Sequence, residues 1–423
     1  MISDRVKKSF IRYGLALAIW VLQAAPPCAC SPVEAGVSAV LAGLGMENLR
    51  VAVDPEGTIR VEYENRVYRS ELMAAGIVAA VVARRAPSSP VLLLTPLNRG
   101  VPICEIIVDL DAHRRFLNHE MDDKAYASTL RVRESGAKSH EHAAIRPSFG
   151  RIDLTVYPGT TLHLGNYDDR FKIMGYLLPE LAAQLWPGAN FSGRLVIPLH
   201  DEIGVYSNEV RPCRAVLSQS VRIPMQGFLL AHAGLFEPDR WGVSTEVGYH
   251  LFERRVALGM TVDYTGFLLY QHRRWRYSRI GRLTARACFS YYLDAYDIEI
   301  GLGYGKFLLG DKGWLAEARR TWNETELGLC FAVTDVDKFG GVQLTVPLPP
   351  FKRPRPAALR LTPPRTLSWN YRATSKVNTY GAPALTGLAV SAGTSVKQLQ
   401  KRMFGPYIRN NIALWREAPG CLR

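Results

Sequence analysis

Most of this chain alternates between apolar and polar residues with a period of two. The alternation begins near Phe149, and between Val256 and Tyr264 the residues Val, Leu, Met, Val and Tyr alternate with Ala, Gly, Thr and Asp. Such a period gives each strand one apolar and one polar face. The alternating stretches run to about 9 to 11 residues, enough for a tilted strand to cross a bilayer, whereas soluble strands have about 5 to 6. The pattern favours a membrane β-barrel over a soluble sandwich, which also alternates.

Aromatic residues near the expected strand ends support the same prediction, because membrane barrels carry an aromatic girdle there. Residues 149–416, at about 16 residues per strand and connection, allow about 16 antiparallel strands, and an even count is expected. A barrel this wide holds water rather than a packed core. Seven prolines between Val346 and Arg365 predict a loop there, and Thr394–Phe404 predicts a short helix in the lumen or at its rim. The aromatic residues are Trp241, Tyr270, Trp275, Tyr277, Tyr296, Tyr304, Trp314 and Trp322.

The first 30 residues have the three parts of an export signal. A basic start precedes the apolar core Leu15–Leu22, and small residues follow ahead of Pro26. Residues 1–30 are therefore predicted to be a signal peptide. Cys28 and Cys30 leave lipid attachment open as an alternative, although neither follows a sequence of the Leu-Ala-Gly type.

Residues 31–125 alternate between helical and strand periods, which predicts a small N-terminal α/β domain. Helices are expected over Val33–Met46 and Ser70–Arg84, and a strand over Ile103–Leu110. We expect residues 126–423 to form the barrel. The predicted fold is thus mainly β, a large transmembrane antiparallel barrel with a small α/β domain.

Composition and motifs exclude several functions. No apolar run approaches the roughly 18 to 20 residues of a membrane-spanning helix. No Walker A loop, dinucleotide fingerprint, nucleophile elbow or zinc-ligand spacing occurs, so we predict no cofactor and no metal. The net charge is +14, with its sharpest clusters at 273–276 and 352–355. In an exported chain this favours acidic polysaccharide or anionic lipid headgroups, and no nucleic acid partner is predicted.

Two stretches resemble the YjbH-like exopolysaccharide proteins of Gram-negative outer membranes. One runs from Gly305–Gly313 (GKFLLGDKG) through Thr334–Val336 to Val346–Leu348, similar to the family's Gly-Asp-x-Gly, Thr-Asp-Val and Ile-Pro-Leu succession. The other is Val61–Asn65 with Tyr68–Ser70, similar to a Tyr-Glu-Asn, Tyr-Arg segment. The resemblance extends over most of the chain ahead of residue 348. It implies an outer-membrane barrel with a periplasmic α/β module that serves export or assembly of a surface polysaccharide.

This chain departs from the family pattern after Phe339–Gly340. The family often has an additional Gly-Ser-Phe-Asp-Lys-Gly segment at this point, whereas Gly341 and Val342 follow at once in this sequence. A shortened hairpin is expected here.

If the apolar faces contact lipid, the polar faces line the lumen. Mixed charges with Tyr suit a hydrated glycan, because they offer hydrogen bonds without a deep binding minimum. The alternative is that these charges only brace a wide barrel as ion pairs. The expected lumen-lining residues are Arg151, Asp153, His163, Glu246, His250, Asp263, Arg286, Tyr292, Asp294, Asp297, Glu299, Glu317, Arg319 and Glu326.

We therefore predict a non-enzymatic conduit or scaffold for export or assembly of a surface exopolysaccharide. Its expected partners are the polysaccharide, outer-membrane lipid and periplasmic export machinery. One alternative is a general diffusion porin. Another is a secreted glycan-trimming enzyme that uses the neighbouring carboxylates Asp297 and Glu299. Proximity of carboxylates is a weak catalytic signal by itself, so no catalytic residue is predicted.

Overall fold

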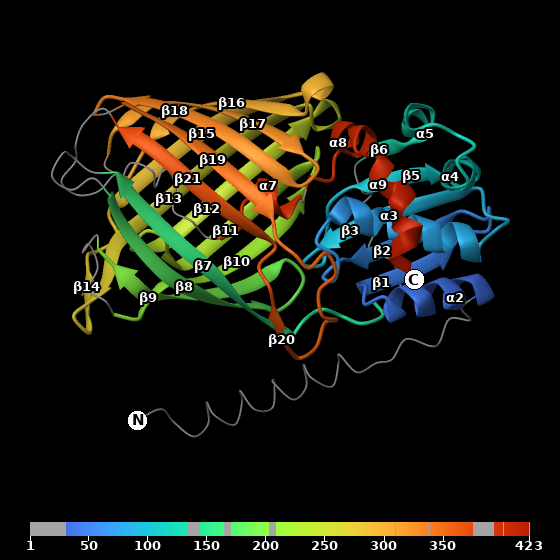
Figure 1. Ribbon diagram of the computed structural model, residues 1–423, viewed down its shortest axis with the longest axis horizontal. Coiled ribbons are helices and arrows are strands. Elements are labelled where there is room, and N and C mark those ends of the chain that lie inside the picture. The colour runs from blue at the N-terminus through green and yellow to red at the C-terminus, as the bar shows by residue number, and fades with distance from the viewer. Residues whose placement is uncertain are drawn as a thin grey trace, which may run out of the picture.

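The computed structural model describes residues 31–133, 144–164, 171–202, 209–308, 310–336, 338–374, 393–400 and 402–422. These residues form a six-stranded sheet with helices and a larger sheet of fifteen strands (Figure 1). The predicted mainly β fold is confirmed, and the strand count is close to the expected number. Among the described residues, no helix has both the length and the apolar character needed to cross a membrane.

The six-stranded sheet and its helices form an α/β part. Both expected helices are present, and Ser31 and Ser70 cap their N-termini through side-chain hydrogen bonds to backbone N–H groups. Strands β2 and β3 pair in parallel, and the other pairs are antiparallel. The helices are α2 (Pro32–Gly43), α3 (Glu71–Arg85), α4 (Leu110–Leu117) and α5 (Asp123–Thr129); the strands are β1 (Glu47–Val53), β2 (Ile59–Glu64), β3 (Val91–Asn98), β4 (Val101–Pro102), β5 (Glu105–Asp109) and β6 (Arg131–Arg133).

Helices from the C-terminal end of the chain complete the core of this α/β part. Trp415 is fully buried, and its indole N–H donates to the carbonyl oxygen of Leu72 on α3 at 2.9 Å. A Cβ atom at Gly76 would lie 2.8 Å from Trp415 Cδ1, so glycine is required for this close approach. This return crosses the domain boundary predicted at residue 125. The elements are α8 (Gly405–Asn410), α9 (Ala413–Glu417) and the 3₁₀ helix η3 (Ala418–Leu422).

The fifteen-stranded sheet is an antiparallel meander in which most strands pair with their neighbours in sequence. Its exception is β20, which pairs in parallel with β7. The strands are β7 (Ile152–Leu164), β8 (Phe171–Gln184), β9 (Ala189–Asp201), β10 (Arg211–Ile223), β11 (Gly227–Phe236), β12 (Arg240–Leu251), β13 (Val256–Gln271), β14 (Arg274–Tyr277), β15 (Arg282–Leu293), β16 (Ile298–Lys306), β17 (Lys312–Trp322), β18 (Thr325–Thr334), β19 (Lys338–Pro347), β20 (Leu359–Thr362) and β21 (Thr366–Thr374).

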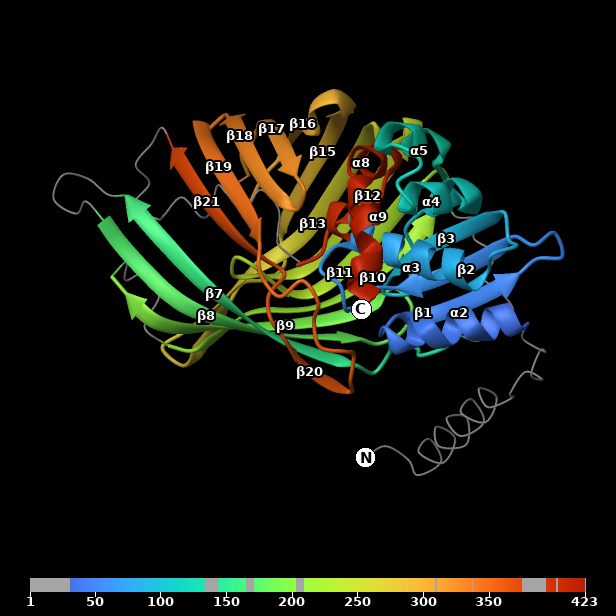
Figure 2. The ribbon, with the colours of Figure 1, turned by 45° about the vertical axis from the view of Figure 1, so that its right-hand side comes forward.

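The large sheet curls round on itself, with the α/β part at one end (Figure 2). Leu308, in the connection between β16 and β17, packs against Val216 of β10 and Phe236 of β11, so this connection reaches across the interior of the curl. The order of paired strands ends at β20 and β21, which do not pair with each other over the residues that the structure describes. Closure into the predicted barrel is therefore not shown. Within the proline-rich segment expected to be a loop, β20 occupies a short stretch that contains no proline.

The exposure of the large sheet is the reverse of that in a soluble protein. On β13, Leu258, Met260 and Tyr264 are 44%, 53% and 46% exposed, whereas Asp263 and Thr265 are 2% and 0% exposed. The same alternation continues on neighbouring strands. We call the face that carries Asp263 and Thr265 the inner face, and the opposite one the outer face. The main apolar core of the described residues lies in the α/β part instead.

Candidate functional site

The inner face of the large sheet is occupied by a short C-terminal helix, α7 (Val396–Leu399). Ser395 and Gln398 form a capping box that explains why a helix starts here, as the sequence predicted. The backbone N–H of Val396 donates to Glu246 Oε1 at 3.2 Å. A Cβ atom at Gly248 would lie 2.8 Å from Val396 Cγ1, so glycine makes room for the helix. Helix α7 therefore lies directly on the inner face of β12.

A turn of the α/β part meets α7 at the same place. Val101, at the start of β4, packs with Phe228 and Leu230 of β11 and with Val396 and Leu399 of α7. The side-chain amide of Asn98 donates to the carbonyl oxygen of Leu399 at 2.7 Å. The turn between β3 and β4 and the helix α7 together fill the interior of the curl at its α/β end. We call Asn98–Val101 and α7 the plug.

Arg254 joins the large sheet to the α/β part and to the C-terminal segment. This buried side chain lies in the turn between β12 and β13, and its guanidinium donates to the carbonyl oxygens of Met403 at 2.7 Å and Ile103 at 2.8 Å. Arg222, near the end of β10, donates to the carbonyl oxygens of Pro102 and Ile103 at 2.9 and 3.0 Å. Two arginines from the large sheet thus hold the α/β part through backbone carbonyls.

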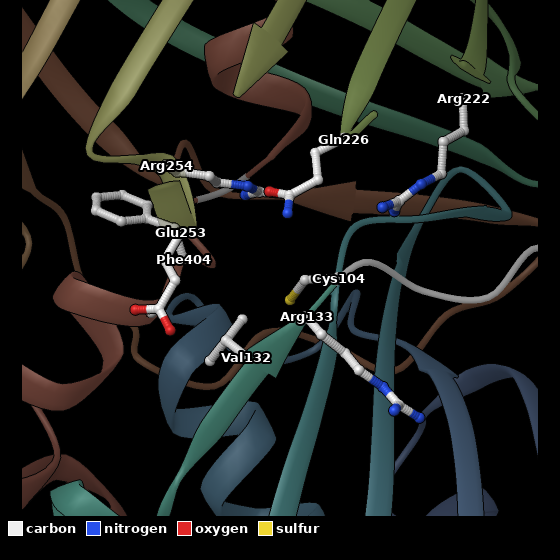
Figure 3. A pocket seen from close by; sticks show the side chains of 9 residues that line it. Cys104, Val132, Arg133, Arg222, Gln226, Glu253, Arg254 and Phe404 are labelled. Atoms are coloured by element: carbon white, nitrogen blue, oxygen red, sulfur yellow. The ribbon is translucent and has the colours of Figure 1, made fainter. Parts of the chain in front are cut away.

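A small cavity lies at this junction, where Arg222, Gln226 and Arg254 face Cys104 of the α/β part (Figure 3). Its empty volume is about 240 Å³, part of it open to solvent. Burial lowers the pKa of Arg254 to about 10 and raises the pKa of the Cys104 thiol to about 11, so Arg254 stays charged and Cys104 stays protonated at neutral pH. The cavity is therefore cationic, and its thiol is unreactive.

Three of the expected lumen-lining acids hold the C-terminal segment. Glu246 accepts the N–H of Val396, Glu299 forms an ion pair with Lys397, and Glu326 forms one with Arg402. These acids come from three different strands. Their shared role is to fasten one segment to the inner face.

Two other expected residues connect β7 to the α/β part. Arg151 Nε lies 2.8 Å from Glu47 Oε1, and Asp153 Oδ2 lies 2.6 Å from Arg66 Nη2 and 2.8 Å from Arg360 Nη2. Burial raises the pKa of Glu47. The positive charges of Arg66 and Arg151 partly offset this rise, because they stabilise the carboxylate. This network belongs to the joint between the two parts.

The turn between β15 and β16 is fastened to α8. Tyr292 donates its hydroxyl to Asp297 Oδ1 at 2.5 Å, and the Asn410 amide donates to the same oxygen at 2.8 Å and to the carbonyl oxygen of Asp294 at 2.6 Å. Arg255 pairs with Asp294 at 2.7 Å. Both aspartates are engaged in contacts that hold a turn and a helix together.

The contacts of the remaining charged residues lie within the large sheet. Asp263 accepts hydrogen bonds from Ser244 Oγ at 2.6 Å and Thr284 Oγ1 at 2.8 Å. Glu317 and Arg319, two residues apart on β17, form an ion pair at 2.9 Å. These contacts hold polar side chains together on the buried side of the sheet.

Two of the expected residues, His250 and Arg286, have buried nitrogen atoms without a hydrogen-bond partner among the described residues. His250 on β12 is 7% exposed, and neither of its ring nitrogens has a hydrogen-bond partner among the described residues. The buried Nε of Arg286 likewise lacks one within those ranges. His163 is in β7, but its side chain lies outside the described residues.

Sequence reasoning missed several interior charges. Glu180 Oε2 accepts from Arg194 Nε at 2.9 Å and from Arg214 Nη2 at 2.5 Å, linking β8, β9 and β10. Arg99 extends from the β3–β4 turn of the plug, and burial lowers its pKa to about 10. The strand residues could have been found by extending the alternation to β8–β10. Arg99 and Arg254 lie in turns, where apolar and polar residues do not alternate, so the strand pattern could not indicate them.

The inner face offers charged groups and hydrogen-bonding groups to a polar ligand. No group of three or more His, Cys, Asp or Glu side chains with metal-binding geometry occurs in the part of the chain that the structure describes.

No curated protein and no solved structure matches this chain. The model of the family described as "Exopolysaccharide biosynthesis protein YbjH" matches residues 26–356, which confirms the resemblance seen in the sequence. The chain belongs to the YjbH exopolysaccharide biosynthesis family.

Proposed function

We propose that this protein is an outer-membrane β-barrel that serves as a conduit or scaffold for export or assembly of an exopolysaccharide. Its α/β part would lie in the periplasm and dock the export machinery. The observation that carries the proposal is the reversed exposure of the large sheet. Membership of the exopolysaccharide biosynthesis family supports the class of substrate.

The apolar outer face needs an apolar environment. Monomeric soluble proteins rarely expose contiguous apolar patches larger than a few hundred Å². Here large apolar residues are exposed on many strands of the sheet. Lipid can cover an apolar surface this extensive, whereas a single protein partner would cover only part of it. On β10, β12, β13, β15–β19 and β21 these residues include Leu217, Val243, Leu258, Phe289, Leu302, Trp314, Phe331, Leu344 and Trp369, with exposed fractions of 42%, 49%, 44%, 46%, 49%, 54%, 61%, 38% and 43%.

Lipid also favours closure of the sheet. Backbone N–H and C=O groups on a free strand edge cannot be satisfied in hydrocarbon, so membrane sheets close into barrels. Strand β20 covers only Ile152–Thr155 of β7, so the rest of the β7 edge and the edge of β21 are the ones that would have to meet. The predicted signal peptide, on residues 1–30, fits an exported chain but lies outside the described residues.

The plug favours a conduit over a general diffusion porin. A diffusion porin requires a permanently open lumen, whereas here α7 and the β3–β4 turn fill one end of the interior. An enzyme is not favoured, because Asp297 is engaged by Tyr292 and Asn410 and Glu299 by Lys397.

Fractionation and gene deletion test the proposal. The protein should be found in the outer-membrane fraction and run faster on gels unboiled than boiled, as folded barrels do. A deletion strain should lose surface polysaccharide and keep normal uptake of small solutes. A soluble protein without the mobility shift would overturn the barrel, and normal polysaccharide in the deletion strain would overturn the export role.

Weakening the plug should open the interior. The double substitution Lys397→Glu and Arg402→Glu replaces two ion pairs by repulsion from Glu299 and Glu326. We expect open-channel conductance in planar bilayers to be at least about ten-fold more frequent than for the unsubstituted protein, since the carboxylates of Glu299 and Glu326 are partly buried and would repel the new carboxylates. The matched control is Lys124→Glu with Arg131→Glu, which makes the same charge change at exposed positions of the α/β part. Equal conductance of both variants would show that α7 is not a barrier.

A further inference from the structure

Strands β13 and β14 form a hairpin at the end of the large sheet that lies away from the α/β part (Figure 1). Residues 272–279 are all exposed, and the hairpin contains the sharpest basic cluster of the sequence. Arg274 and Arg276 lie on β14, opposite Gln271 and Leu269 of β13. This end would be the outer mouth of the proposed barrel.

The strand register places four arginines on the inner face at this mouth. Residues opposite each other in an antiparallel pair share a face, and alternate residues along a strand do too. Thr265 on the inner face lies opposite Arg282, so Phe267, Leu269 and Gln271 are on that face as well. Their own partners across the ladders are Arg240, Arg276 and Arg274. We call Arg240, Arg274, Arg276 and Arg282 the arginine rim.

Among the described residues, no acidic side chain is paired with the arginine rim. None of the four guanidiniums has an ion pair or a side-chain hydrogen bond within the ranges that the structure describes. The Asp239 carboxylate beside Arg240 pairs with Arg211 instead, and Arg240 and Arg282 repel each other. The plug end differs, because Arg402 and Arg409 there pair with glutamates.

We infer that the arginine rim binds an acidic polysaccharide through the carboxylate groups of its sugars. The inference rests on the proposed function and specifies the substrate class of the same interior. A guanidinium presents a planar fork of donors that matches a carboxylate with two parallel hydrogen bonds. Several cations around one mouth concentrate a polyanion there. Three arginines of the rim are exposed and Arg240 is half-buried. Each contact is therefore weak, so a moving chain can leave one arginine as it meets the next.

The facing of the hairpin favours a glycan over lipid headgroups. Tyr270 and Trp275 lie opposite each other on β13 and β14, with ring centroids 5.0 Å apart. They alternate with the rim residues and so lie on the outer face, where they suit an interfacial aromatic girdle. Arginines that served lipid phosphates would be expected on that same outer face.

Charge reversal on the hairpin tests the inference with the full chain in detergent micelles. The probe is an oligogalacturonate of fixed length, with a neutral malto-oligosaccharide of equal length for comparison. The double variant Arg274→Glu and Arg276→Glu should bind oligogalacturonate at least about ten-fold more weakly at low salt. The control Lys124→Glu with Arg131→Glu should bind as the unsubstituted protein does. Both substituted arginines are exposed, so the unboiled gel mobility should not change.

Three outcomes would overturn the inference. The first is that the arginine variant binds oligogalacturonate as tightly as the unsubstituted protein, and the second is that the neutral oligosaccharide binds equally well. The third is that the variant loses binding to lipopolysaccharide but keeps binding to oligogalacturonate, which would assign the rim to lipid phosphates. Failure of the proposed function is a separate result. If the deletion strain lacks surface polysaccharide while the arginine variant restores it fully, the export role stands and the arginine rim is not its acidic-glycan site.

Discussion

Replacing Trp415 by Ala is expected to destabilise the α/β part by about 3 to 5 kcal/mol, the usual cost of truncating a fully buried large aromatic. Trp415 is 0% exposed, packs against Gly76 and donates its indole N–H to Leu72. The loss should appear in hydrogen exchange, as faster opening of the amides of α3. Trp415→Phe keeps most of the packing and loses the hydrogen bond, so a smaller loss of about 1 kcal/mol is expected.

Trp186→Ala provides the comparison for that experiment. Trp186 is 51% exposed and lies between β8 and β9, away from the α/β core. Its truncation should leave exchange on α3 unchanged. Unaltered exchange in Trp415→Ala would mean that the α/β part is stable without α9.

Replacing Leu258 by Arg is expected to prevent assembly of the large sheet in the membrane. Leu258 is 44% exposed on the outer face of β13, and arginine at the bilayer midplane costs about 2 to 4 kcal/mol in a membrane barrel. Unfolded barrel strands are also removed by periplasmic proteolysis, so the amount of protein should fall. The measurement is the fraction of outer-membrane protein whose gel mobility changes on boiling.

Thr261→Lys tests the opposite face of the same strand. Thr261 lies opposite Glu246 on β12, so a lysine there gains an acidic neighbour on the inner face. This variant should assemble normally. Normal assembly of Leu258→Arg, or failure of both variants to a similar extent, would contradict the assignment of the outer face to lipid.

The strand pattern was predictable because its cause is local. Side chains of a strand alternate whatever the strand pairs with, so the apolar residues of β13 and β15 identify one face from sequence alone. The exposures of Leu258 and Phe289 against those of Asp263 and Thr284 agree with that alternation. The short helix near residue 396 was predictable for the same reason, since Ser395 and Gln398 define its start.

What could not be predicted depends on contacts between residues far apart in the chain. Glu246 and Val396 are separated by 150 positions, and no local pattern indicates that they meet. Arg254 lies in a turn, where side chains follow no regular alternation. Its partners are backbone carbonyl groups, which every residue has, so the sequence does not indicate them. The parallel pairing of β20 with β7 likewise joins segments about 200 residues apart. Closure of the sheet is of this kind too, because it depends on which edges meet.

The return of α8 and α9 to the α/β part also sets an order of events. Met403, Ile408, Ile412 and Trp415 belong to the same core cluster as α3, although every strand of the large sheet lies between them in sequence. During synthesis, which delivers a chain from its N-terminus onward, this core stays incomplete until the strands have all emerged. A chain interrupted within the strands would keep an open apolar surface on α3. That surface would distinguish interrupted from full-length molecules and leave them exposed to chaperones and proteases.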